Sequence, residues 1–149
     1  MNEEYYYEEE IQYFTAEELE LIHFAIMELT DDSEQAGIKY PDRFDSCLKR
    51  PQTDYFGEPQ YPTLLEKAGA YFHSVCKDHI FHNGNKRTAL AVLTTFLQIN
   101  GYELTMTPEE AEEYTVLVAD DDSYKGNGVA RRIAADLADF VAPIEEEEY

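Results

Sequence analysis

The stretch that follows Gly84 constrains the fold more than any other feature, because it is apolar on nearly every side until Asn100 and Gly101 end it. Its apolar residues are Ala89, Leu90, Ala91, Val92, Leu93, Phe96, Leu97 and Ile99. A helix that is apolar all round is stable only where other elements cover it. The sequence therefore predicts one central, buried helix surrounded by the rest of the chain.

The other predicted helices have one apolar face each. Capping boxes at Thr15 to Glu18 and at Thr107 to Glu110 mark two helix starts. The predicted helices cover residues 15–30, 42–48 and 63–79, residues 107–119, and a last segment that reaches Val141. Only residues 102–106 suggest a short extended piece. We predict an all-α fold, a single bundle of about six helices.

Length and charge narrow the class of protein further. The chain has 149 residues, the size of one domain, and its 32 acidic against 11 basic residues give a formal charge of −21. Such a charge excludes a broad basic surface for DNA or anionic lipid. We predict a domain over residues 15–141, between flexible acidic tails rich in Tyr and Glu at 1–14 and 142–149.

Neither the N-terminus nor the cysteines suggest export. No apolar run approaches the length of a membrane span, and the first residues are acidic where a signal peptide would be basic. Cys47 and Cys76 fall on different predicted elements without metal-binding spacing, so we expect two reduced cysteines. These features predict a cytoplasmic protein that does not interact with membranes.

The segment between the third and fourth predicted helices carries the chemistry. It reads His79-Ile-Phe-His-Asn-Gly-Asn-Lys-Arg-Thr-Ala-Leu90. Gly84 allows close approach of the backbone to a ligand, and the free amides of Asn85, Lys86 and Arg87 at a helix start form an anion site. The cationic side chains of Lys86 and Arg87 strengthen that site. His79 can accept a hydroxyl proton.

The remaining histidines and the irregular segment have less specific interpretations. His79 and His82 lack a third ligand for a metal, and His23 and His73 sit beside apolar positions, as packed or surface residues do. Residues 50–62 contain prolines and Gly57 and predict a loop or flap. Its Tyr55 and Phe56 either cover the core or line a groove where a target peptide docks.

The pattern HxFx(N/D)(G/A)NKRTAL resembles the signature of the Doc (death-on-curing) branch of the Fic/Doc, or Fido, superfamily. The resemblance extends over about residues 15–140, including Tyr55 to Gly57 and residues 65–68 and 96–104. It implies the Fido-type helical bundle, with the active-site loop at the start of the central helix.

The resemblance also implies roles for individual residues. His79 corresponds to the catalytic base, which deprotonates the target hydroxyl. Phe81 corresponds to the aromatic residue that anchors the loop. The turn that cradles the anion corresponds to Gly84 and Asn85, and the phosphate-holding cations correspond to Lys86 and Arg87.

Two departures from the Fic adenylyltransferases match the Doc branch. Lys86 stands where they have a second glycine, and Leu90 where they have a second arginine. In the Doc branch ATP is thought to bind in the reverse orientation, so that the γ-phosphate is transferred. The resemblance therefore implies a kinase that uses ATP, with an adenylyltransferase as the catalytic alternative.

Asn83 is a third departure, because the family usually has Asp or Glu there to help hold Mg²⁺. An Asn carbonyl is a weaker ligand for a hard cation. We expect Asn83 to lie at the phosphate site and Mg²⁺ to be bound mostly by nucleotide phosphates and water. A non-catalytic binding module is the second alternative.

The resemblance implies partners as well. The self-inhibitory pattern (S/T)-x-x-x-E-(G/N) has no match, since Thr30 to Glu34 continues with Gln35 and Thr105 to Glu109 continues with Glu110. Restraint would then come from an antitoxin protein, a disordered segment of which folds onto the toxin. The acceptor implied is a Ser or Thr hydroxyl of a host protein such as elongation factor Tu, as for a toxin that stops translation.

Overall fold

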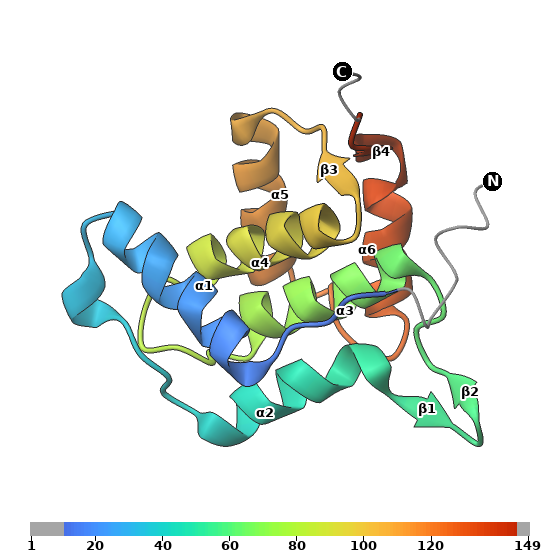
Figure 1. Cartoon of the computed structure of the whole chain (residues 1–149), viewed down its shortest axis with the longest axis horizontal. Helices are drawn as coiled ribbons and strands as arrows, with labels where there is room; N and C mark the ends of the chain where they lie inside the picture. The colour runs from blue at the N-terminus through green and yellow to red at the C-terminus, as the bar shows by residue number, and fades with distance from the viewer. Residues whose placement is uncertain (1–10, 146–149) are drawn as a thin grey trace.

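The computed structural model describes residues 11–145 and confirms the all-α prediction. Its α-helices are α1 (Ala16–Leu29), α2 (Pro41–Lys49), α3 (Leu64–Lys77), α4 (Asn85–Ile99), α5 (Pro108–Asp120) and α6 (Val129–Leu137). Short 3-10 turns η3 (Ser33–Gln35), η4 (Arg50–Gln52) and η5 (Ala138–Phe140) join them. Figure 1 shows α3 and α4 running through the middle of the molecule.

The centre of the bundle is a pair of helices, although the apolar pattern predicted one. α4 packs against α1, α3 and α5, and α3 packs in addition against α2 and α6. Small residues explain why α3 is so deeply covered: Gly69 has no side chain, and a Cβ there would lie 2.8 Å from the carbonyl oxygen of Ala130 in α6. This close approach lets α6 cover α3, a helix for which the sequence predicted only one packed face.

Both predicted capping boxes form. The Thr15 hydroxyl accepts from the amide of Glu18 at 3.1 Å, and the Glu18 carboxylate accepts from the amide of Thr15 at 2.9 Å. Thr107 and Glu110 make the same pair of bonds at the start of α5. These reciprocal bonds fix the starts of α1 and α5 as the sequence predicted.

The prediction that the last helix reaches Val141 is wrong. α6 ends at Leu137, and after η5 the chain becomes strand β4 (Val141–Pro143), which pairs antiparallel with β3 (Tyr102–Leu104). The partners are Tyr102 with Pro143 and Leu104 with Val141. Backbone pairing with the extended piece predicted near residue 102 thus replaces the last helical turn.

The segment predicted as a loop or flap contains a small hairpin, β1 (Asp54–Tyr55) paired with β2 (Glu58–Pro59). The Phe56 side chain at its tip is fully exposed, and Tyr55 is 59% exposed. The two aromatic rings therefore do not cover the core, and neither lines the pocket described below.

Residues 11–14 precede α1 without regular secondary structure and are bonded to the bundle. Phe14 is buried and its amide donates to the Tyr71 hydroxyl at 3.1 Å, while the amide of Gln12 donates to Asn100 Oδ1 at 2.8 Å. In the predicted C-terminal tail, residues 142 and 143 belong to the paired strand β4. Residues 1–10 and 146–149 of the predicted tails lie outside the described residues. Among the helices of residues 11–145, none is both long and apolar enough to span a bilayer.

Candidate active site

The loop between α3 and α4 turns sharply at Gly84. Gly84 has φ +71°, a left-handed conformation that costs little only for glycine, and it caps the N-terminus of α4. The Asn85 side chain closes the loop, because its Oδ1 accepts from the Phe81 amide and its Nδ2 donates to the Phe81 carbonyl, both at 3.0 Å. Asn85 thus shapes the turn with its side chain, and the first amides of α4 have no partner within the helix, as at any helix start.

All the site residues predicted from the sequence line one pocket. The cavity has a volume of about 840 Å³, and its wall includes the six residues His79, Asn83, Gly84, Asn85, Lys86 and Arg87. The opposite wall comes from α4 and α5: Leu90, Pro108, Glu112, Thr115, Val116, Ala119 and Asp120. The pocket is therefore polar and cationic where α4 begins, and more apolar between α4 and α5.

His79 lies in this wall at the end of α3, and its side chain is exposed. Its φ of +51° is unusual for a residue with a side chain and costs on the order of 1 kcal/mol. Within residues 11–145 its imidazole makes no hydrogen bond. The ring is thus held in a strained loop with both nitrogens available to a ligand.

Lys86 faces an acidic residue across the pocket. Its Nζ lies 3.3 Å from Oδ1 of Asp120, the last residue of α5, and both side chains are at least half exposed. An exposed ion pair of this kind contributes about 1 kcal/mol or less. An incoming anion can therefore replace the Asp120 carboxylate at Lys86 without a large penalty.

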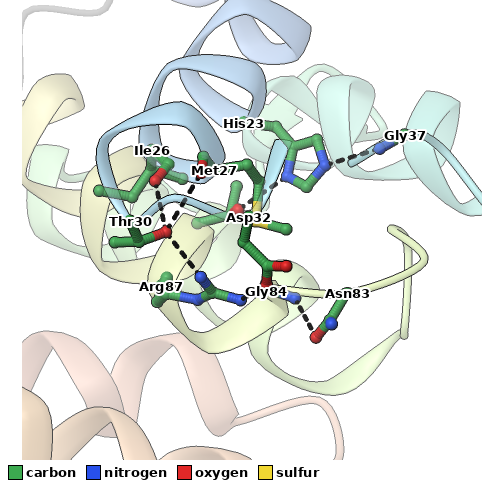
Figure 2. Close-up of polar contacts among 10 residues, drawn as sticks. His23, Ile26, Met27, Thr30, Asp32, Gly37, Asn83, Gly84 and Arg87 are labelled. Atoms are coloured by element: carbon green, nitrogen blue, oxygen red, sulfur yellow. Dashed lines mark hydrogen bonds and ion pairs between the residues drawn. The ribbon is translucent and has the colours of Figure 1, made fainter. Parts of the chain in front are cut away.

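Arg87 is bound to the end of α1 (Figure 2). Its Nη1 donates to the Thr30 hydroxyl at 2.6 Å, and its Nη2 pairs with Asp32 Oδ2 at 2.9 Å. A guanidinium carries five N–H donors, so these contacts leave others for a phosphate. Asp32 reaches Arg87 because Asp31 has φ +57° and the Asp32 amide turns back to the carbonyl of Met27.

Asn83 bends its side chain back onto the loop, where Oδ1 accepts from the Gly84 amide at 2.8 Å (Figure 2). Among the described residues no group of three His, Cys, Asp or Glu side chains could hold a metal ion. The pocket wall nevertheless offers oxygen ligands, the Asn83 amide and the carboxylates of Glu112 and Asp120. Oxygen ligands of this type suit Mg²⁺ when phosphates and water complete its shell.

His23 belongs to the site's support, a role that the sequence did not reveal. The sequence placed it among packed or surface residues, and it is fully buried on α1, with both ring nitrogens in hydrogen bonds. Burial, together with the positive charge of Arg87 and the nearby His82, lowers its pKa to about 4. Its spacing from Leu19 and Met27, which places it on the buried face of α1, was the signal that could have indicated this position.

Of the other two histidines, His82 lines the pocket and His73 lies outside its wall. His82 is exposed, and its amide donates to the Gly37 carbonyl at 2.9 Å. His73 is half-buried against the Arg50 guanidinium, and its Nε2 contacts the Tyr124 carbonyl oxygen at 3.0 Å. Burial lowers the pKa of His73.

Comparison with known proteins shows what this chain is similar to. The family model described as the Fic/DOC family matches residues 13–97, which include the whole 79–90 segment. A protein of Mycolicibacterium smegmatis named "Toxin Doc" is 40% identical over 104 residues, covering 66% of this chain and 73% of the relative. A protein of Escherichia phage P1 named "Protein kinase doc" is 33% identical over 76 residues, 51% of this chain and 60% of the relative.

Proposed function

Because the chain belongs to the Fic/Doc family, in its Doc branch, we propose that it is a Doc-type toxin that transfers phosphate from a nucleoside triphosphate to a protein hydroxyl. The names of the two relatives, one a toxin and the other a protein kinase, support this class of activity. The residues of the pocket support the chemistry.

One observation carries the proposal: His79 and the N-terminus of α4 line the same cavity, beside Lys86 and Arg87. Helix N-termini bind phosphate through free amides and the helix dipole. In a chain with a formal charge of −21, this helix start carries two cationic side chains, each paired with a carboxylate. A volume of about 840 Å³ is large enough for a ligand of nucleotide size.

The reaction needs a proton acceptor and charge neutralisation, and the pocket holds both. The acceptor hydroxyl oxygen forms a bond to the γ-phosphorus while the bond from that phosphorus to the bridging oxygen breaks. The hydroxyl proton passes to the imidazole of His79, and the nucleoside diphosphate leaves. Lys86, Arg87 and the amides that follow Gly84 hold the phosphates, and positioning of this kind supplies most of the rate in phosphoryl transfer.

ATP is the proposed phosphate donor, and Mg²⁺ would supply further neutralisation of phosphate charge when bound. Asn83, Glu112 and Asp120 are the side chains whose oxygens would face it. The phosphate that reaches Lys86 takes the place of the Asp120 carboxylate.

The finer part of the proposal concerns partners. The acceptor is a Ser or Thr hydroxyl of a host protein, with elongation factor Tu as the first one to test. A toxin of this kind needs restraint, and we propose a separate antitoxin protein that docks a disordered segment on this chain.

The test uses ATP labelled separately at the α- and γ-phosphorus. We expect protein-bound label from the γ position only, and no label with the His79→Ala variant, because that variant lacks the base. Binding of ADP to His79→Ala, measured by calorimetry, controls for a folded pocket. Label retained from the α position would replace the kinase with an adenylyltransferase.

Asn83 favours a second candidate, a non-catalytic binding module. Its amide stands where the family resemblance implies a carboxylate, and its Oδ1 is already bonded to the Gly84 amide. Expression of the parent and of His79→Ala in a sensitive host separates the two functions. If both proteins arrest growth equally, toxicity depends on binding alone, and the phosphotransfer proposal fails.

A further inference from the structure

α1 contacts the active-site loop with one face of the helix (Figure 2). His23, Met27 and Thr30 lie on this face at i, i+4 and i+7. His23 bonds to Thr88, Thr30 bonds to Arg87, and the Met27 sulfur fills the space where a Cβ on Gly84 would lie. Of the three, His23 makes the most contacts to separate segments of the site.

The hydrogen bonds of His23 define its tautomer. The Gly37 amide can only donate, so Nε2, 3.0 Å away, is the acceptor. Nδ1 therefore carries the proton and donates it to the Thr88 hydroxyl oxygen at 2.9 Å. Its pKa of about 4 keeps the imidazole in this neutral form near pH 7.

The ring of His23 also supports the loop directly. It stacks on the Phe81 ring with centroids 3.8 Å apart and planes 11° from parallel, and the Phe44 ring packs edge-on against Phe81. Phe81 lies between His79 and Gly84 in sequence, and its backbone is bonded to the Asn85 side chain. A fixed Phe81 therefore restricts the whole turn between the proposed base and the proposed anion site.

The Gly37 contact extends the support to the other side of the loop. The Gly37 carbonyl accepts from the His82 amide at 2.9 Å, and Ile38 forms a β-bridge with Phe81. The Ile80 carbonyl accepts from the amides of Lys39 and Tyr40. By holding Gly37, His23 fixes the strand-like segment against which residues 80–82 are paired.

We propose that His23 is a positioning residue for the transfer reaction, a proposal that rests on the proposed function. Its imidazole lies outside the pocket wall and touches no reacting group. It acts through Thr88, Phe81 and Gly37, which together place His79 and the amides that follow Gly84.

The first variants separate the two hydrogen bonds. In His23→Gln the amide oxygen lies near the position of Nε2 and retains the bond from Gly37, while the bond to Thr88 and the ring stack are lost. Thr88→Val removes the Nδ1 bond from the other side, and Thr88 lies outside the pocket wall. We expect kcat to fall about tenfold to a hundredfold in His23→Gln, with a smaller change in KM for ATP.

The double variant His23→Gln with Thr88→Val tests whether the two residues act through one bond. We expect it to lose less activity than the product of the single effects, because the shared bond can be removed only once. Losses that multiply independently would contradict the role assigned to this bond.

Leu137→Ala is the matched control, because Leu137 is a fully buried residue of α6 outside the pocket wall. It lowers stability by creating a cavity and is expected to retain parental kcat. If His23→Gln is destabilised to the same degree and also retains parental kcat, His23 is an ordinary core residue and the proposal is overturned.

Amide hydrogen exchange without nucleotide distinguishes failure of this inference from failure of the proposed function. We expect exchange in residues 79–88 to rise at least tenfold in His23→Gln and to stay parental in Leu137→Ala at equal overall stability. If exchange of residues 79–88 rises only in His23→Gln but the parent protein transfers no phosphate, the loop-positioning role is supported and the proposed reaction is contradicted. If exchange is the same in both variants, the positioning role is rejected.

Discussion

At the scale of single residues, the carboxylate of Asp120 competes with a bound phosphate for the ammonium group of Lys86. Its carboxylate lies 3.3 Å from the lysine nitrogen within the pocket wall, and both side chains are exposed to solvent. We expect Asp120→Asn to tighten ADP binding about two- to fivefold, because a pair of this exposure contributes up to about 1 kcal/mol. Calorimetric titration of ADP without divalent metal measures this effect. In the absence of metal the carboxylate cannot contribute to ADP binding as a metal ligand, so its pairing with Lys86 and its repulsion of phosphate are measured alone.

Asp122→Asn provides the control for that change. Asp122 is exposed, carries the same charge two residues further along the chain and lies outside the pocket wall. It alters the net charge equally and should leave ADP affinity within about 1.5-fold, because screened charges outside the site contribute little. Equal gains from both variants would mean that net charge, and not the contact to Lys86, limits binding.

Gly84 connects the residue scale to that of the elements, because α1 packs into the space that its missing side chain leaves. Alanine at this position would meet the sulfur of Met27, a fully buried residue of α1, and would also adopt φ +71°. We expect Gly84→Ala to lower the free energy of unfolding by about 2 to 3 kcal/mol, from strain plus overpacking. Urea unfolding measures the loss.

Gly57→Ala isolates the contribution of strain. Gly57 has φ +83°, and nothing lies within 4 Å of a Cβ there, so alanine costs only its conformational strain, about 1 kcal/mol. The difference between the two variants is the cost of displacing α1. Equal losses of stability in Gly84→Ala and Gly57→Ala would show that displacing α1 has no measurable free-energy cost, and that its packing does not constrain the active-site loop.

The elements that could be predicted are those whose boundaries are set by neighbouring residues. Thr15 with Glu18, and Thr107 with Glu110, form capping boxes within a single turn, and Gly84 begins α4 where expected. β4 was missed because its stability depends on β3, which is distant in the sequence. Local signals therefore located the helices, while pairing between distant segments required the structure.

The candidate site divides in the same way. The site residues between His79 and Arg87 come from one continuous segment, so the sequence could group them, and they line the same pocket. Asp32, Asp120 and His23 come from other elements, and only tertiary packing brings them to Arg87, Lys86 and Thr88. The sequence predicted that Lys86 and Arg87 bind phosphate. The structure adds that each forms an ion pair with a carboxylate.

At the scale of the whole molecule, a net charge of −21 repels itself. We expect the urea midpoint to rise as NaCl increases from about 0.05 to 0.3 M, because the screening length falls through about 10 Å near 0.1 M. Specific ion pairs such as Arg87 with Asp32 act in the opposite direction, since salt weakens them. A midpoint that falls with salt would show that such pairs outweigh the general repulsion.

A charge-reversal variant shows whether repulsion causes this salt dependence. Glu109 and Glu113 are exposed on α5 one turn apart, where like charges destabilise a helix. Glu113→Lys changes the net charge by two and places a cation next to Glu109. We expect the free energy of unfolding at low salt to rise by about 0.5 kcal/mol, which appears as a higher urea midpoint. The further gain from NaCl should then be smaller than in the parent. If the rise in urea midpoint with NaCl is unchanged in the variant, the salt acts through hydration or chloride binding. Repulsion within the acidic surface would then have no measurable effect on stability.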